Sequence, residues 1–490
     1  MKAMDKTVYI FDKFKAVCFL INGLYYIYDS YSNKILQISS RLFSLIEDMD
    51  GNENTSNDSK VGDMFQLFQE KFDCLKTYSF EKSFFDGAKI KNDSSLSQKL
   101  SEVDELVLNI TEDCNFRCKY CFYSKLSVQD TSYNQHNKMT EETAIKSVDL
   151  FMEKSQAGVT YTISFFGGEP LLNFKLIKNV VEYANRKYDN IVYTITTNGY
   201  LLKGEILKYL VDNDVRVTIS IDGPKGIHNA NRVTMKGGGS FDIVKSNIET
   251  IVSSYPKYFQ TNVFLNAVVD MDMCTDFQEL EAFFDLNFKG LGFSVQPAEY
   301  TNDFAKSGLY KRYKEHFLQR YVDEHVKGFS DQFSIPRMFV FNEMHKRILL
   351  FHYREDVPVN LVSKFVPMGL CVPGSKRLFV SYNGDFYPCS KVFYHQSMVI
   401  GNIYEGIDIP AVINYYNEYI DLSERRCRNC WAIRICKSCY LSAMGQLSGP
   451  TTSNDACVIL KQDYLDLIGA YIMIISHNPN AFEIYNNLNQ

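Results

Sequence analysis

The sequence lacks any long hydrophobic run. Its longest mostly apolar stretches, such as residues 263–269 and 471–475, are far shorter than the ~18 residues that a membrane-spanning helix needs. The N-terminus begins with charged residues and has no apolar signal core followed by a small-residue cleavage site. These absences predict a cytoplasmic protein that does not insert into a membrane.

The sequence also lacks a strong charge of either sign. Lys plus Arg total 52 and Asp plus Glu total 58, so the net charge is −6. A mildly acidic chain has no basic footprint for nucleic acid, and we expect no nucleic-acid partner. No internal repeat occurs at the periods of solenoid proteins.

Cysteine, by contrast, is abundant, with 13 residues in a chain of 490. In a reducing compartment, clustered cysteines indicate metal ligation or redox chemistry rather than disulfides. Three of them fall within residues 114–121 and seven within residues 371–457. The other three, Cys18, Cys74 and Cys274, are isolated, and we expect them to be small, partly buried apolar residues.

The first 82 residues predict a small separate module. Two apolar runs, residues 7–11 and 16–27, are typical of β-strands, with Asn22-Gly23 as a hairpin turn. Helical periodicity follows at residues 40–49 and 61–72. Strands followed by short helices predict a winged-helix-like module, and the polar residues 83–104 predict a linker.

From residue 105 the pattern changes to an alternation of strands and helices. Apolar runs with amphipathic helices between them predict right-handed βαβ units and a parallel sheet. The predicted strands are residues 106–110, 160–166, 191–196, 215–221, 262–269 and 292–296. Six units are too few for an eight-fold barrel, so the α/β fold expected over residues 105–300 is a partial (β/α)6 TIM-like barrel. Functional groups should then gather at the carboxyl ends of its strands.

The rest of the chain divides into three predicted segments. Residues 301–366 predict a helical connector, and residues 461–490 predict a C-terminal helix and tail. Between them, residues 367–460 are short of apolar runs and rich in turns and cysteine, so we expect a small domain held together by metal clusters.

The first cysteine group directly follows the first predicted barrel strand. Cys114, Cys118 and Cys121 have the spacing C-x3-C-x2-C. Three thiolates on one short loop suit three irons of a 4Fe–4S cube and leave the fourth iron without a protein ligand. A zinc knuckle is the structural alternative, but no second Cys or His pair follows at the spacing that zinc sites use.

Three polar motifs end the next three strands: FGGEP at residues 166–170, TTNG at 196–199 and SIDGP at 220–224. Glycines at 167 and 168 allow close backbone approach to a ligand. The Glu169 carboxylate suits an ammonium group, the Arg232 guanidinium suits a carboxylate, and Ser220 and Asp222 suit hydroxyls. On one rim above a cysteine loop, these groups predict a pocket for an amino acid joined to a ribose.

The ordered set of C-x3-C-x2-C, GGEP, TTNG and SIDGP resembles the radical S-adenosylmethionine (SAM) superfamily, in particular the branch with a C-terminal SPASM extension. The resemblance implies that Cys114, Cys118 and Cys121 bind a 4Fe–4S cluster whose fourth iron is chelated by SAM. It also implies reductive cleavage of SAM to a 5′-deoxyadenosyl radical that abstracts a hydrogen atom from the substrate. The implied SAM-binding residues are Tyr120, Gly167, Gly168, Glu169, Thr197, Asn198, Ser220, Asp222 and Arg232.

The second cysteine group resembles the seven-cysteine SPASM pattern, with one residue fewer than usual before Cys439. Two four-cysteine zinc sites would need eight thiolates, and His395 is the one histidine in this span. The resemblance implies two auxiliary 4Fe–4S clusters, for three in all. Cys427, Cys430, Cys436 and Cys457 would hold the outer cluster, and Cys371, Cys389 and Cys439 the inner one. The fourth position of the inner cluster could be filled by Cys274, by another upstream cysteine or by a substrate thiolate, and we favour a position that is open or filled by the substrate.

A small N-terminal module before this pair of domains resembles the element that modifying enzymes of ribosomal peptides use to bind a leader peptide by strand addition. A purely structural cap on the barrel is the alternative. The first hypothesis for the reaction is sulfur-to-carbon thioether formation in a Cys-containing precursor peptide, with a flavodoxin or ferredoxin as reducing partner. The catalytic groups beyond the clusters, including any general base, are not identified.

Three other functions are open. The first is carbon–carbon or carbon–oxygen crosslinking of a peptide. The second is anaerobic sulfatase maturation, in which a Cys or Ser becomes formylglycine. Those enzymes typically carry an Asp after the cysteine equivalent to Cys389, where this chain has Ser390. The third is a non-catalytic iron–sulfur or zinc protein that binds peptide.

Overall fold

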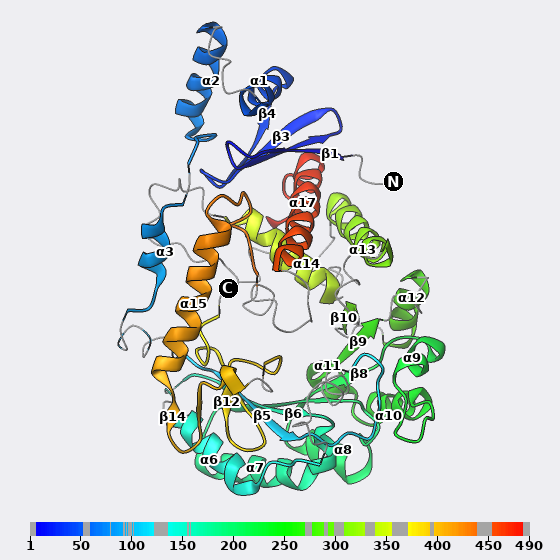
Figure 1. Cartoon of the computed structure of the whole chain (residues 1–490). Helices are drawn as coiled ribbons and strands as arrows, with labels where there is room; N and C mark the ends of the chain where they lie inside the picture. The colour runs from blue at the N-terminus through cyan, green and yellow to red at the C-terminus, as the bar shows by residue number, and fades with distance from the viewer. Residues whose placement is uncertain are drawn as a thin grey trace.

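The computed structural model of the chain is shown in Figure 1. It describes residues 6–51, 59–78, 80–91, 94, 96, 100, 102–121, 136–153, 156, 158–269, 277–288, 293–297, 308–328, 339–354, 371–392, 396–438 and 453–483. Within these residues no helix combines the length and apolar composition needed to cross a membrane. Cys274 and Cys439 lie outside the described residues.

The N-terminal module is a four-stranded antiparallel meander followed by helices. Its strands are β1 (Lys6–Phe11), β2 (Ala16–Ile21), β3 (Leu24–Asp29) and β4 (Lys34–Ile38), and its helices are α1 (Ser40–Gly51) and α2 (Ser59–Phe72). The predicted run 16–27 is thus two strands, which meet at a turn where Asn22 and Gly23 both have positive φ. Such a turn matches the twist of the strands on either side. Strand β4 was not predicted.

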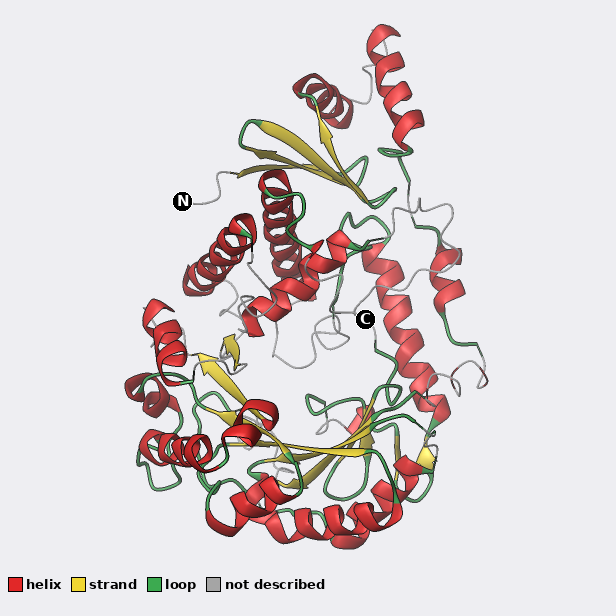
Figure 2. Cartoon of the chain, turned by 180° about the vertical axis from the view of Figure 1, so that it is seen from behind, coloured by secondary structure: helices red, strands yellow, loops and turns green. Residues whose placement is uncertain are grey.

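Six parallel strands form the main sheet, and this confirms the predicted α/β class with a parallel sheet. They lie side by side in chain order: β5 (Glu105–Thr111), β6 (Tyr161–Gly167), β7 (Ile191–Thr197), β8 (Arg216–Ser220), β9 (Val263–Val269) and β10 (Phe293–Pro297). The connections are η1 (Pro170–Asn173), α6 (Glu141–Met152), α7 (Phe174–Lys187), α8 (Gly204–Asp212), α9 (Lys225–Asn231), α10 (Phe241–Ser254), α11 (Pro256–Asn262) and α12 (Phe277–Asn287). Figure 2 shows the helices along the outer side of this curved sheet.

The two faces of the sheet differ in polarity because side chains alternate along each strand. The helix-covered face carries fully buried apolar residues such as Leu108, Ile163 and Ile219. The opposite face is mixed: it carries apolar residues such as Val107 and Phe166, and also the Ser164 and Thr194 hydroxyls, which lie 2.7 Å apart on neighbouring strands. Parallel strands covered on both faces are normally apolar throughout. The polar groups on the inner face therefore indicate that part of it is not used for core packing.

The C-terminal half adds two strands to the same sheet. Strand β11 (Arg377–Val380) pairs in parallel with β5, and β12 (Phe386–Tyr387) pairs with β11. An ion pair stabilises the pairing of β11 with β5, since the Arg377 guanidinium contacts the Glu105 carboxylate at 2.6 Å. The other C-terminal elements are η5 (Gln396–Met398), β13 (Gly401–Asn402), β14 (Gly406–Ile407), α13 (Gly308–Lys327), α14 (Phe339–His352), α15 (Ile409–Cys427) and α17 (Ser453–His477).

Part of the segment predicted as a linker is ordered against the C-terminal half. Helix α3 (Lys82–Ala88) runs beside α15 (Figure 1). The backbone of Ile90 exchanges two hydrogen bonds of 3.0 Å with the side chain of Asn417. The chain therefore returns from the N-terminal module to the sheet along the surface of α15.

Candidate functional site

The first cysteine loop is held by the chain that follows α9. Backbone hydrogen bonds join Arg117 to Val233 (2.8 Å), Lys119 to Asn231 (3.1 Å) and Asn115 to Met235 (3.0 Å). The loop thus forms a short extra layer over the carboxyl end of the sheet, and residues 231–235 become part of the site. Sequence order alone gives no sign of this pairing, because more than 100 residues separate the two segments.

The three loop thiols are partly buried and none is in a disulfide. Burial raises the pKa of Cys114 to about 12, and burial opposed by the nearby Arg232 charge leaves the pKa of Cys118 raised to about 11. The backbone N–H of Phe116 donates to Cys114 Sγ over 3.4 Å. Such protonated thiols bind iron as thiolates, after they lose their protons. N–H groups that donate to sulfur help to set the reduction potential of an iron–sulfur cluster. The donor set fits a cluster with one iron free of protein ligands.

Gly167, the last residue of β6, and Gly168 pack closely against the backbone at the start of the cysteine loop. A Cβ at Gly167 would lie 2.1 Å from the carbonyl oxygen of Thr111, and one at Gly168 would lie 2.3 Å from that of Asp113. The backbone N–H groups of Gly168 and Glu169 donate to the same two carbonyls at 2.8 Å. In this structure glycine is required at both positions because a side chain would clash with the backbone of residues 111–113. This reason is separate from the close approach of a ligand that the sequence suggested.

From a fully buried position, Glu169 links the carboxyl ends of strands β6 and β7. One carboxylate oxygen accepts from Leu171 N at 3.1 Å and Thr197 Oγ1 at 2.7 Å, and the other accepts from Asn198 N at 2.8 Å. Burial raises its pKa to about 7 despite these donors. Asn198 continues the link, since its amide donates to Asn115 Oδ1 in the cysteine loop at 2.7 Å.

Asp222, Arg232 and Tyr120 form a buried cluster beneath the loop. The Arg232 Nε lies 2.9 Å from Asp222 Oδ1, and both side chains are at most 7% exposed. The Tyr120 hydroxyl donates to the other carboxylate oxygen, and the guanidinium lies over the Tyr120 ring. Asp222 Oδ1 also accepts from Val268 N at 2.9 Å. The sequence predicted a ligand carboxylate as the partner of Arg232, whereas here its charge is balanced by Asp222.

His228 and Ser240 support this cluster and were not found from the sequence. The backbone N–H of Asp222 donates to His228 Nδ1 at 3.2 Å, so the ring proton is on Nε2, which is 3.0 Å from Ser240 Oγ. The Ser240 hydroxyl donates in turn to the Arg232 carbonyl at 2.7 Å. Burial, helped by the Arg232 charge, lowers the pKa of His228 to about 3, so the ring is neutral. Because neither residue lies in a recognisable motif, only the folded chain reveals them.

The remaining predicted rim residues lie in the same region. Thr197 ends β7 and is buried, with its hydroxyl used by Glu169. Ser220 ends β8, is buried, and pairs in register with Asn266 of β9. The structure thus brings the GGEP, TTNG and SIDGP motifs, Arg232 and the cysteine loop to one end of the sheet.

Four of the C-terminal cysteines also come together. Cys427 ends α15, Cys430 and Cys436 follow it, and Cys457 lies on α17. Burial, together with the nearby thiols of this group, raises the pKa of Cys427 to about 12 and that of Cys436 to about 11. Backbone N–H groups of Ala432 and Ile433 donate to Cys430, and that of Ser438 to Cys436. Four thiols with amide donors to sulfur fit an iron–sulfur cluster.

The structure describes two of the three cysteines expected to hold the inner cluster, Cys371 and Cys389. Cys371 is exposed and precedes β11, and Cys389 is partly buried after β12. Cys439, its third expected ligand, is outside the described residues, as is Cys274. Cys18 and Cys74 are buried in the N-terminal module, as expected of small apolar residues, and burial raises the pKa of each to about 12.

Comparison with known proteins agrees with this geometry. Residues 108–273 match the radical SAM superfamily, and residues 371–440 match an iron-sulfur cluster-binding domain, SPASM. The chain therefore carries a radical SAM domain followed by a SPASM domain. These domains indicate SAM and iron–sulfur clusters as its cofactors.

The relatives differ in how much of the chain they share. Radical SAM cyclopropyl synthase TigE of Paramaledivibacter caminithermalis is 32% identical over 202 residues, which are 38% of this chain and 42% of that protein. A cysteine-type anaerobic sulfatase-maturating enzyme of Clostridium novyi is 24% identical over 74% of this chain and 94% of its own length. The solved structure of native anSMEcpe with bound AdoMet shares the fold, with a TM-score of 0.56, 21% identity, and coverage of 78% of this chain and 99% of that one.

Proposed function

We propose that this chain is a radical SAM maturase that forms sulfur-to-carbon thioether crosslinks in a Cys-containing precursor peptide. When bound, SAM at the first cluster supplies a 5′-deoxyadenosyl radical that takes a hydrogen atom from the substrate. In the net reaction, each crosslink replaces one cysteine S–H bond and one acceptor C–H bond with a C–S bond, so the peptide loses two hydrogens. Two electrons would leave the peptide: one with the hydrogen atom that the radical takes, and the other to a bound auxiliary cluster, while the thiol proton is released to solvent.

In this proposal, the chain's own residues shape the SAM site. Cys114, Cys118 and Cys121 hold the first cluster, and Gly168 and Glu169 contact the amino group of SAM. Tyr120 lies against the adenine, and Asn198 and Ser220 contact the ribose. Asp222 fixes the orientations of the Arg232 and Tyr120 side chains, because it forms an ion pair with Arg232 and accepts a hydrogen bond from the Tyr120 hydroxyl.

The observation that carries the peptide assignment is the N-terminal sheet. Within the described residues, β1 pairs only with β2 and β4 only with β3, so each presents an edge on which a leader peptide can add a strand. The module has a small core of its own, built from residues such as Phe14, Ile27 and Ile46. We assign residues 1–82 to leader recognition, 105–300 to a partial (β/α)6 barrel and 367–460 to the SPASM domain, with a winged-helix-like topology for the first.

Three 4Fe–4S clusters complete the proposal, with the inner auxiliary cluster on Cys371, Cys389 and Cys439. An iron position open to a substrate thiolate would place the peptide's sulfur beside the carbon radical. A flavodoxin or ferredoxin is the proposed source of electrons. Peptide substrates are supported by a related solved structure, native anSMEcpe with bound AdoMet and the Cp18Cys peptide.

Mass spectrometry of a precursor peptide tests the reaction. Short Cys-containing peptides encoded near the gene are each co-expressed with the wild-type chain or with C118A under anaerobic conditions. We expect the peptide to lose two hydrogens per link with wild type and none with C118A, and alkylation to find fewer free thiols. A peptide of unchanged mass would contradict the proposal.

Two other peptide reactions have specific support. The C. novyi relative matches most of this chain, and sulfatase maturation would convert one Cys or Ser to formylglycine and leave no crosslink. Ser390 after Cys389 counts against this reaction. The relation to a cyclopropyl synthase favours carbon–carbon bond formation, which also removes two hydrogens but leaves every cysteine thiol free to alkylate.

A further inference from the structure

The turn between β3 and β4 is unusual because it is buried although it is polar. Asp29, Ser30 and Ser32 are each 0% exposed, and Asn33 is 7% exposed. Turns normally lie on the surface, since buried backbone groups need partners. Asp29 Oδ2 accepts from Ser32 N at 2.9 Å, which satisfies part of the turn from within. From outside the turn, the Tyr78 hydroxyl donates to Ser30 Oγ at 2.8 Å, and Arg354, just after α14, donates from Nε to the Asn33 carbonyl at 2.7 Å.

A further set of contacts comes from the segment that carries the outer auxiliary cysteines. Arg434 donates from Nη1 to the carbonyl of Tyr31 at 3.0 Å, and the Trp431 ring meets the Tyr28 ring edge-on. Arg428 and Phe80 are joined twice, through Phe80 N to the Arg428 carbonyl at 3.3 Å and Arg428 Nε to the Phe80 carbonyl at 3.2 Å. Arg428, Trp431 and Arg434 all fall between Cys427 and Cys436.

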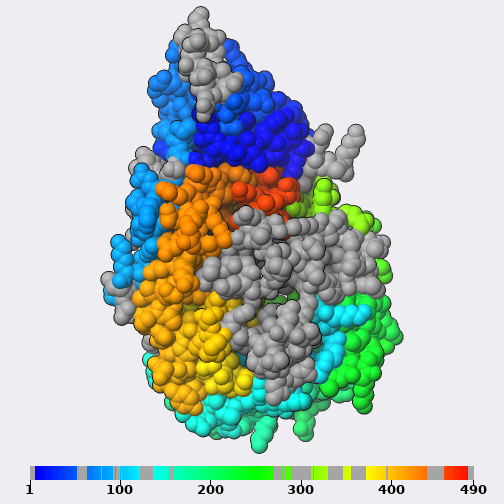
Figure 3. All heavy atoms as spheres, viewed as in Figure 1, coloured from blue at the N-terminus to red at the C-terminus, as the bar shows by residue number. Residues whose placement is uncertain are grey.

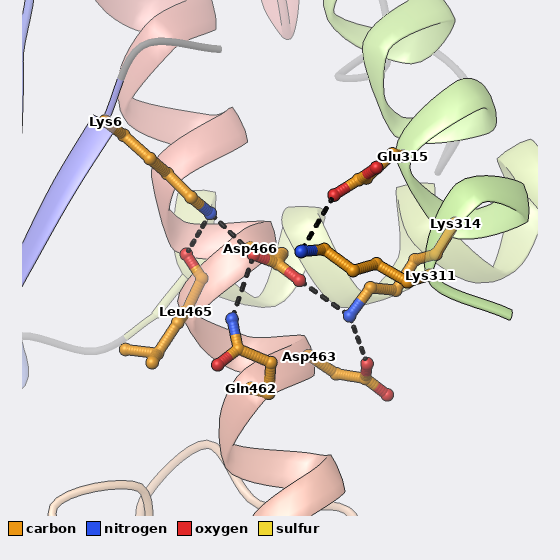
Figure 4. Close-up of polar contacts among 8 residues, drawn as sticks. All are labelled: Lys6, Lys311, Lys314, Glu315, Gln462, Asp463, Leu465 and Asp466. Carbon is orange, nitrogen blue, oxygen red and sulfur yellow. Dashed lines mark hydrogen bonds and ion pairs between the residues drawn. The ribbon is translucent and has the colours of Figure 1, made fainter. Parts of the chain in front are cut away.

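A second group of contacts reaches the helix that carries the fourth cysteine. Lys6, the first residue of β1, bonds Asp466 at 2.6 Å and the Leu465 carbonyl at 3.3 Å on α17 (Figure 4). Lys314 of α13 contacts the same Asp466 at 2.6 Å. The neighbouring lysines hold the pKa of Asp466 below its usual range although burial opposes this. In the space-filling view, the N-terminal module lies directly on these C-terminal segments (Figure 3).

Apart from Arg354, the docking contacts described above come from the two segments that supply the cysteines of one site: residues 427–436 and α17, which begins at Ser453 and bears Cys457. A cluster bound to Cys427, Cys430, Cys436 and Cys457 would crosslink them. We propose that occupancy of this cysteine site fixes the platform on which the N-terminal module docks, so that the outer auxiliary cluster controls attachment of the module. A loaded cluster then does more than accept electrons, because an enzyme without it would hold its N-terminal module loosely.

This coupling is separate from the proposed reaction, and its test uses no peptide. Hydrogen exchange of residues 28–33 is followed by mass spectrometry in the anaerobically reconstituted full chain. In C427A/C430A/C436A we expect exchange of this segment to rise at least about tenfold, while strands β5 to β8 keep their protection. The matched control C114A/C118A/C121A loses a cluster at the other site and should leave the segment unchanged. No rise in the first variant, or an equal rise in both, would overturn the proposal.

A second pair of variants keeps every cysteine. R434M removes the hydrogen bond to Tyr31, and R425M removes an exposed arginine of α15 whose side chain makes no described contact with the module. Because coupling is reciprocal, R434M should both speed exchange of residues 28–33 and speed removal of iron by a chelator, each several-fold relative to R425M. If R434M frees the turn but loses iron at the R425M rate, docking and cluster occupancy are independent and the proposal is wrong. This pair also decides the matter if the triple cysteine variant fails to fold.

Discussion

Breaking the Asp222–Arg232 pair should destabilise the carboxyl end of the barrel strongly. R232M removes the cation and leaves a carboxylate that is 1% exposed and still bonded to Val268 N. Removing one partner of a buried ion pair typically costs about 3–5 kcal/mol, because the remaining charge is left uncompensated. D222N should cost a similar amount for the same reason. R216M, which removes an exposed arginine at the start of β8, is the matched control and should change stability by less than about 0.5 kcal/mol.

The double variant D222N/R232M makes the reasoning quantitative. Once both charges are gone, no uncompensated ion is left, so the double variant should be less destabilised than the sum of the single variants by about 2 kcal/mol or more. The assay is urea-dependent hydrogen exchange of strands β8 and β9, because the chain has several domains and global unfolding is not expected to be two-state. Additive single effects, or a stable R232M, would refute the claim that Arg232 is held by Asp222 rather than free for a ligand.

Three further predictions follow from individual residues. G168A should destabilise the end of β6 by about 3 kcal/mol and lower iron incorporation at the first site, because its Cβ would lie 2.3 Å from the Asp113 carbonyl oxygen. The control G237A, at positive φ with open space around it, should cost only about 1 kcal/mol. Equal losses of stability in urea titrations of the two variants would argue against the contact. The pKa of His228 is lowered to about 3, so between pH 3 and 6.5 this residue binds fewer protons in the folded chain than in the unfolded chain. The free energy of unfolding should therefore fall as pH drops through this window, by up to about 1.4 kcal/mol per pH unit. H228Q should flatten that slope, and an unchanged slope would show that His228 does not cause it. Reconstituted wild type should bind about 12 irons and C114A/C118A/C121A about 8, measured by iron assay, and a total near 4 in wild type would rule out three clusters.

Much of the catalytic half of the fold could be predicted from the sequence because its signals are local. The six strands β5 to β10 lie within one residue of the predicted ranges, since each is a short run rich in apolar and β-branched residues between helices. Strand β4 was missed because Lys34–Ile38 is short and follows a polar turn whose burial depends on a distant partner. Strands β11 and β12 could not be assigned to the main sheet, because their pairing with β5 spans about 270 residues and leaves no local pattern.

The candidate site shows the same division between local and non-local information. Motif spacing correctly predicted which residues gather at the carboxyl ends of the strands. It could not predict what each side chain contacts: Arg232 is paired with Asp222, and Glu169 accepts three donors from the chain. His228 and Ser240 join the network without belonging to any motif. Such contacts depend on how loops cross one another, which periodicity and composition do not record.

The central claim is that the loop of Cys114, Cys118 and Cys121 carries a cluster with one iron left for SAM. Anaerobically reconstituted protein, reduced with dithionite, is mixed with SAM and assayed for 5′-deoxyadenosine by liquid chromatography. The account predicts 5′-deoxyadenosine from wild type and none from C118A. Wild-type protein that retains zinc at this loop, or that carries its full iron and still leaves SAM intact, would contradict it.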